Sequence, residues 1–178
     1  DHPARGLNSL DRETSFASTG AVDDLLATFA ERGIVRLDAV FDDASAQVMQ
    51  DAVWREWGAR FGSRRDDPTT WSSAPAWGQL PSVKRNPVFR NILGPPLRSL
   101  ADALLGGDWT ASSGFGNVLA SFPDIDRWTL PGSSGQWHSD FAYTVPMTPL
   151  PALRVFAVFG DVAPGGGGTL LVAGSHRM

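Results

Sequence analysis

The segment Gly135–Phe141 carries the two residues best suited to chemistry, His138 and Asp140. Side chains two residues apart on a β-strand point to the same side of it. An imidazole nitrogen and a carboxylate oxygen placed in this way could bind the same metal ion. With a second His from elsewhere, they would form the set of two His and one carboxylate that holds Fe(II) in non-haem oxygenases. A His-x-Asp pair alone is common, so its meaning depends on the elements around it.

Apolar residues recur at helical spacing in three stretches, which predict helices at about 22–33, 42–57 and 95–106. Asp42 or Asp43 is the expected N-cap of the second helix, and Gly33 and Gly106 are the expected ends of the first and third. The residues expected to face inward are Val22, Leu25, Leu26, Phe29, Met49, Val53, Trp57, Leu97, Leu100, Ala101 and Leu104. Residues 58–94 show no sustained period and are interpreted as a loop region that could include a lid.

Strand-like patterns occupy residues 34–40 and dominate the second half of the chain. There the predicted strands are 109–113, 115–122, 135–141, 152–162 and 168–173. Helices followed by antiparallel strands predict an α+β fold, a jelly roll (double-stranded β-helix) with the N-terminal helices packed on it. The chain is therefore interpreted as one domain, 1–178, with a helical and lid region at 1–107 and jelly-roll strands at 108–178.

Composition narrows the possible functions of the chain. The 178 residues carry a net charge of −4 and no Cys, so a metal ion would have to be held by His and carboxylate ligands. The sequence has no stripe of basic residues with aromatic residues between them, which is the pattern that would favour nucleic-acid binding. The sequence has no apolar run long enough to span a membrane and no segment that resembles a signal peptide. We therefore expect a soluble, cytoplasmic protein with no membrane partner. Oligomeric state cannot be predicted from these patterns.

Three segments resemble the phytanoyl-CoA dioxygenase family of Fe(II)/2-oxoglutarate-dependent oxygenases. They are 33–42 with the helix after it, the metal motif Trp137–Phe141, which is similar to that of ectoine hydroxylase, and the strand, turn and strand at 158–176. The resemblance implies oxidation of a C–H bond by O₂, coupled to decarboxylation of 2-oxoglutarate. His138 and Asp140 match the first two iron ligands. The third ligand, a His, and an Arg that binds 2-oxoglutarate lie beyond Met178 in the family, so we expect the roll to be incomplete at its C-terminus.

Four further residues are candidates for binding or for structural roles. Thr169 follows four glycines and could donate to a 2-oxoglutarate carboxylate; it could equally be a β-branched residue that starts a strand. Asn117 could face solvent, but we favour a position in the pocket, where it would contribute to binding 2-oxoglutarate. His176 is interpreted as part of the Gly-Ser-His turn, shaping it by hydrogen bonds, rather than as an iron ligand. Arg154 could anchor a substrate carboxylate, but a salt bridge to Asp126 or Asp161 is favoured.

The preferred prediction is a dioxygenase that hydroxylates or desaturates a small-molecule substrate, with Fe(II), 2-oxoglutarate and O₂. The carboxylate at Asp140 favours these outcomes over halogenation, because halogenating relatives have a small residue at the matching position. One alternative is a non-catalytic jelly-roll module or fragment that lacks the third iron ligand. Another is a cupin-type metalloprotein that uses O₂ without 2-oxoglutarate. The substrate itself cannot be read from these residues.

Overall fold

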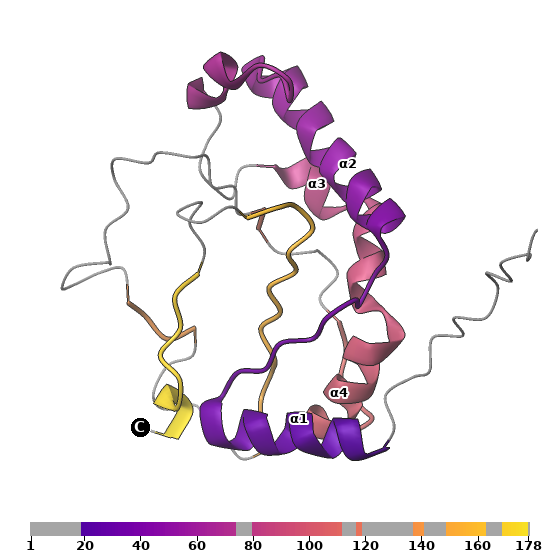
Figure 1. Ribbon diagram of the computed structural model, residues 1–178, viewed down its shortest axis with the longest axis vertical. Helices are drawn as coiled ribbons and strands as arrows, with labels where there is room; N and C mark the ends of the chain where they lie inside the picture. The colour runs from indigo at the N-terminus through magenta and orange to yellow at the C-terminus, as the bar shows by residue number, and fades with distance from the viewer. Residues whose placement is uncertain are drawn as a thin grey trace, which may run out of the picture.

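The structure is a computed structural model that describes residues 19–73, 80–111, 117–118, 137–140, 149–162 and 169–177 (Figure 1). Its helices in chain order, with η marking a 3-10 helix, are α1 (Thr19–Arg32), α2 (Asp43–Phe61), η1 (Pro68–Ser73), α3 (Pro81–Lys84), η2 (Pro87–Leu93), α4 (Pro95–Leu105) and η3 (Ser175–Arg177). Figure 1 shows α2, α3, α4 and α1 following one another around a curved outer layer. The later extended segments, at 149–162 and 169–172, lie on the inner side of that layer.

Helix α2 begins and ends with local capping interactions that the sequence predicts. The carboxylate of Asp42 accepts a hydrogen bond from the Ser45 amide at 2.8 Å, which satisfies a backbone donor in the first turn. Gly62 has a φ of 70° and donates to the Gly58 carbonyl at 3.1 Å, as helix-ending glycines do. The helix buries Met49, Ala52, Val53 and Trp57 on one face, so the predicted N-cap and inward face are confirmed.

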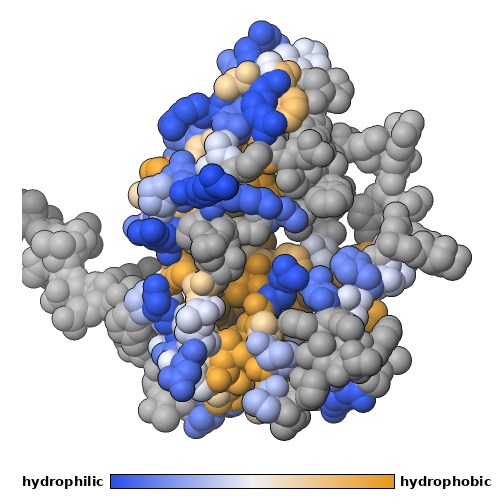
Figure 2. Space-filling model, turned by 180° about the vertical axis from the view of Figure 1, so that it is seen from behind, coloured by the Kyte–Doolittle hydropathy of each residue, from blue (hydrophilic) through white to orange (hydrophobic). Residues whose placement is uncertain are grey.

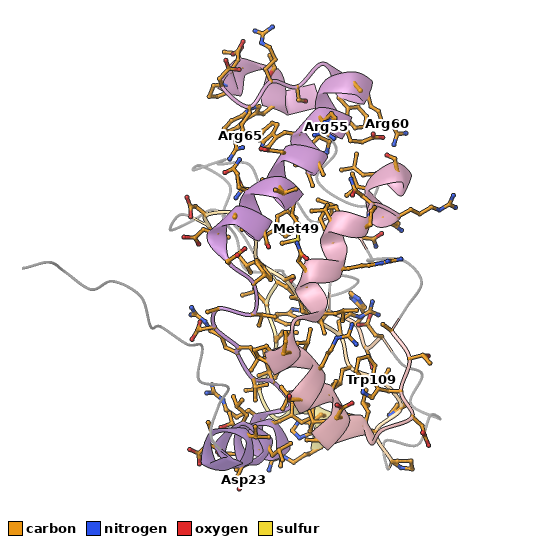
Figure 3. The ribbon with its side chains drawn as sticks, turned by 90° about the vertical axis from the view of Figure 1, so that its right-hand side faces the viewer. Asp23, Met49, Arg55, Arg60, Arg65 and Trp109 are labelled. Carbon is orange, nitrogen blue, oxygen red and sulfur yellow. The ribbon has the colours of Figure 1, made fainter. Side chains whose placement is uncertain are left out.

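The hydrophobic core lies where α2 packs against α3 and η2. Met49, midway along α2, is 0% exposed, and Figure 3 shows it between α2 and the helices that follow. The buried members of the core are Met49, Ala52, Val53, Trp57, Leu80, Val83 and Phe89. Val118 and Phe159, from the second half of the chain, pack against its edge. The core is therefore mainly helical, with two later residues attached to it.

Helix α4 begins directly after Gly94, where two parts of the chain lie close together. A Cβ at Gly94 would be 3.3 Å from a side-chain carbon of Val40, so the connection before α2 and the start of α4 pass close to each other. Pro95 occupies the first turn of α4, where a missing N–H costs no hydrogen bond. Leu97, Leu100 and Ala101 are buried as predicted, and α1 packs against this helix.

The predicted jelly roll is wrong. Among the described residues there is no β-strand; one isolated bridge joins Arg64 and Asp67. Of the predicted strands, 34–40, 109–111, 152–162 and 169–172 are extended or irregular backbone without a hydrogen-bonded ladder in the described part of the chain. Most of 115–122 and 135–141 lies outside the described residues. Alternating apolar residues make a segment compatible with extended backbone, but a strand also requires a partner at the correct register.

The loop region 58–94 contains three short helices, which its sequence did not predict. Helices of four to seven residues are too short to show an apolar period, so η1, α3 and η2 had no recognisable signal. The Trp71 side chain packs against Trp54 of α2 with ring centroids 5.7 Å apart and donates to the Arg64 carbonyl at 2.8 Å. Arg65 reaches back to Asp51 of α2 at 3.0 Å, beside the helix in Figure 3.

Large apolar side chains remain exposed along the extended segments. They include Val155, Phe156, Val158 and Val162 in one segment and Leu170, Leu171 and Val172 in the other. Figure 2 shows apolar surface in the lower half of the molecule, bordered by hydrophilic residues. None of the helices in the described ranges is both long enough and apolar enough to cross a lipid bilayer.

Candidate metal site

His138 and Asp140 lie on a short irregular segment, 137–140, and their side chains approach each other. The Nε2 atom of His138 is 3.7 Å from Oδ1 of Asp140. The segment is not a strand and bends at Trp137 and at Asp140, yet it brings the imidazole and the carboxylate together. A nitrogen donor and an oxygen donor therefore share one small region of space.

The separation of these two atoms suits coordination of a single metal ion after a small adjustment. With bonds of about 2.1 Å, two ligands at 90° lie about 3.0 Å apart, and two tetrahedral ligands about 3.4 Å apart. A side-chain rotation that moves either tip by a few tenths of an ångström would bring these two atoms from 3.7 Å to a separation that suits one metal ion. The side chains are open to solvent, with His138 72% and Asp140 39% exposed. The donor set of one imidazole and one carboxylate fits a divalent ion such as Fe(II).

The second carboxylate oxygen of Asp140 has a partner of its own. Arg154 Nε donates a hydrogen bond to Asp140 Oδ2 at 2.9 Å. We expected a salt bridge to Asp126 or Asp161 instead. Asp126 lies outside the described residues, and the arginine pairs with Asp140, fourteen positions earlier in the chain. The two residues are 14 positions apart, so no local sequence period could have indicated this pair.

The Asp140 carboxylate lies between two nitrogen-bearing side chains, the imidazole of His138 and the guanidinium of Arg154. The guanidinium of Arg154 compensates the charge of the carboxylate, so the pair is neutral without any bound ion. Arg154 is 60% exposed, and exposed ion pairs contribute only about 0–1 kcal/mol to stability because water and salt screen them. The pair therefore matters more for where the carboxylate oxygens point than for holding the fold together.

The two residues predicted to contact 2-oxoglutarate lie on exposed backbone. Thr169 opens the extended segment at 169–172, and Asn117 precedes the half-buried Val118. Among the described residues, no hydrogen bond joins either side chain to His138 or Asp140. Their predicted role in cosubstrate binding stays a prediction.

His176 has a structural position at the end of α1. Its Nε2–H donates to the Ala30 carbonyl at 3.1 Å, and Gly174 N–H donates to the Arg32 carbonyl at 2.7 Å. These donors satisfy carbonyls in the last turn of the helix, which have no partner within it. The Gly-Ser-His turn was expected to be shaped by hydrogen bonds close by in the chain; the imidazole instead bonds a residue 146 positions earlier. Within the described ranges, no group of three His, Asp or Glu residues is arranged to hold a metal ion.

Comparisons of the chain with protein-family models, with curated proteins and with solved structures found no match. The functional interpretation therefore rests on the residues and on the geometry of the His138–Asp140 pair.

Proposed function

We propose that this chain is an Fe(II)/2-oxoglutarate-dependent dioxygenase that hydroxylates or desaturates a small molecule, and that His138 and Asp140 are two of its iron ligands. The observation that supports this most is the 3.7 Å approach of the imidazole Nε2 to the carboxylate Oδ1. Support also comes from the three sequence segments that resemble the phytanoyl-CoA dioxygenase family, which occur in the family's order. The proposal concerns the metal chemistry and does not require the predicted jelly roll.

The two side chains have complementary tasks in this proposal. His138 offers a neutral imidazole nitrogen, and Asp140 offers an anionic oxygen that offsets part of the charge of a divalent ion. Iron bound by two His and one carboxylate keeps open positions at which O₂ and 2-oxoglutarate can be activated for C–H oxidation. Because Asp140 retains its carboxylate, the proposal is for hydroxylation or desaturation.

A second candidate is a domain that takes up metal without catalysis. The observation that favours it is the openness of the pair, since His138 is 72% exposed and oxygenases exclude water from the reacting centre. A cupin-type metalloprotein would also take up iron but would show no dependence on 2-oxoglutarate. These candidates differ in what they bind, so binding experiments separate them.

The test is an anaerobic titration of the purified protein with Fe(II), followed by 2-oxoglutarate. A dioxygenase gives the weak visible charge-transfer band of the chelated cosubstrate, and His138→Ala and Asp140→Ala abolish it. His176→Ala is the matched control, because that imidazole contacts the end of α1 and should leave the band intact. Iron binding without a band would favour a metal-binding domain or a cupin-type protein. Absence of iron binding would overturn the proposal.

A further inference from the structure

We infer that Arg154 is a positioning residue, which turns the Asp140 carboxylate so that a single oxygen, Oδ1, faces the metal together with His138. This inference rests on the proposed function, since it assigns a role at the same site. Arg154 itself binds no metal, because a guanidinium is a donor with no free lone pair for coordination. Its effect would be transmitted through its hydrogen bond to Asp140.

The two oxygens of Asp140 have different neighbours, and this difference is the basis of the inference. Oδ2 accepts from Arg154 Nε at 2.9 Å, whereas Oδ1 is the oxygen 3.7 Å from His138 Nε2. The terminal torsion of an aspartate is broad and nearly two-fold, so an unpaired carboxylate would sample many orientations. A hydrogen bond to one oxygen selects the orientation in which the other oxygen is next to the imidazole.

Arg154 belongs to a segment that is anchored to the helical core. Five residues further on, the Phe159 ring packs edge-on against Phe89 of η2, with centroids 5.7 Å apart. The Phe159 carbonyl also accepts a hydrogen bond from the Gln50 side chain of α2 at 2.6 Å. These contacts hold the segment against the helical core five residues after Arg154. The segment that carries the arginine is therefore tethered to the core, which supports Arg154 as the partner that orients the Asp140 carboxylate.

A guanidinium beside a metal site also repels the metal, so two effects of opposite sign must be compared. Hydrogen-bond partners of metal ligands typically change metal affinity by about 10–100-fold when they are removed. Repulsion between an exposed cation and a nearby dication in a largely aqueous setting changes affinity only by roughly a few-fold. Arg154 is 60% exposed, so its charge is well screened. The orienting effect should be the larger one.

The experiment measures Co(II) binding to the whole chain by calorimetry and by the visible absorption spectrum of the bound ion. Arg154→Gln should weaken binding by about 10-fold, the lower end of this range because the pair is exposed, and alter the Co(II) spectrum, because the carboxylate is no longer held in one orientation. Arg154→Lys keeps the charge but loses the planar Nε donor, so it should also weaken binding. The matched control is Arg36→Gln, which removes another exposed arginine whose Nε pairs with a carboxylate, that of Asp38, at 2.7 Å. This control should leave Co(II) affinity unchanged.

Each outcome either supports the inference or overturns it. Unchanged or tighter binding by Arg154→Gln would overturn it, and tighter binding would mean that the arginine only repels the metal. Full recovery of affinity in Arg154→Lys would also overturn it, because charge alone would then explain the effect. If the unmodified protein binds no Co(II), the proposed function fails as well. If binding depends on His138 and Asp140 but not on Arg154, only the inference fails. Far-UV circular dichroism verifies that each variant is folded, and Arg154→Met replaces Arg154→Gln if the latter is not.

Discussion

The imidazole ring of His176 occupies the space that a side chain on Gly33 would need. A Cβ built on Gly33 would lie 2.7 Å from Cγ of His176, closer than real Cβ atoms approach other groups. Gly33 also has a φ of 71°, in the left-handed region that favours glycine. Conformation and packing therefore require glycine at the same position, directly after α1.

Replacing Gly33 by Ala should destabilise the protein by roughly 2–4 kcal/mol, from backbone strain together with overlap with the imidazole. Urea unfolding followed by circular dichroism measures this change. Gly62→Ala is the matched control, since Gly62 has a φ of 70° but no atom within 4 Å of its Cβ position. That control should cost only about 1–2 kcal/mol.

The contribution of the ring can be isolated with a double variant. If the overlap is real, His176→Ala should recover part of the loss in the Gly33→Ala background, because the space is then free. Strictly additive effects of the two substitutions would contradict the packing described here.

Phe159→Ala should destabilise the protein by about 2 kcal/mol or more, because the ring packs against Phe89 at the edge of the core. The control is Phe156→Ala in the same segment, where the side chain is 47% exposed and little should be lost. Thermal unfolding of both variants tests this. Equal effects would mean that the segment is not anchored through Phe159.

Acid should weaken the protein partly through Asp42. Its hydrogen bonds with Ser45 hold the pKa of this carboxyl below its ordinary value of 3.8 in the folded state. The unfolded state therefore takes up the proton first as the pH falls. The stabilising contribution is complete above a pH of about 4 and is lost as the pH falls through the folded pKa. Denaturant unfolding between pH 6 and pH 2.5 measures this loss.

Asp42→Asn is the informative variant for this pH dependence. Asparagine caps helices as well as aspartate does but carries no titrating carboxyl, so stability should change less steeply below pH 4. Hydrogen bonds from Thr69 and Arg64 also lower the pKa of Asp67. The stability of the double variant Asp42→Asn with Asp67→Asn should therefore depend even less on pH below pH 4. An unchanged acid slope in both variants would contradict this assignment.

Metal binding should also be visible as added stability. A ligand that binds only the folded state at 100 times its dissociation constant adds about 2.7 kcal/mol, which raises the melting temperature by several degrees. Co(II) should therefore raise the melting temperature, and a chelator should reverse the increase. Asp140→Ala should remove the effect. An increase that persists in this variant would place the bound metal elsewhere.

The helices could be predicted because their determinants are local. The cap at Asp42, the buried face of Met49, Val53 and Trp57, and the burial of Leu97 and Leu100 all follow from spacing within one helix, whose hydrogen bonds close within a few residues. The approach of His138 to Asp140 is also local, because the two residues are only two positions apart in the chain.

The rest of the architecture depends on pairings between distant residues. Whether an alternating segment such as 152–162 joins a sheet is decided by a partner strand, and its own pattern carries no information on that partner. Two further contacts could not be predicted from the sequence for the same reason. They are the Arg154–Asp140 pair and the hydrogen bond from Gln50 to the Phe159 carbonyl, which joins residues 109 positions apart. The strand predictions that fall on described residues failed for this reason.

The docking of residues 174–176 on the end of α1 has a consequence for biosynthesis. A ribosome makes the first helix long before it makes this turn, so the Ala30 and Arg32 carbonyls must stay hydrated until the distant segment emerges. A nascent chain released before that point would present a frayed helix end to chaperones and proteases. The last turn of this helix is thus completed only after residues 174–176 have been synthesised.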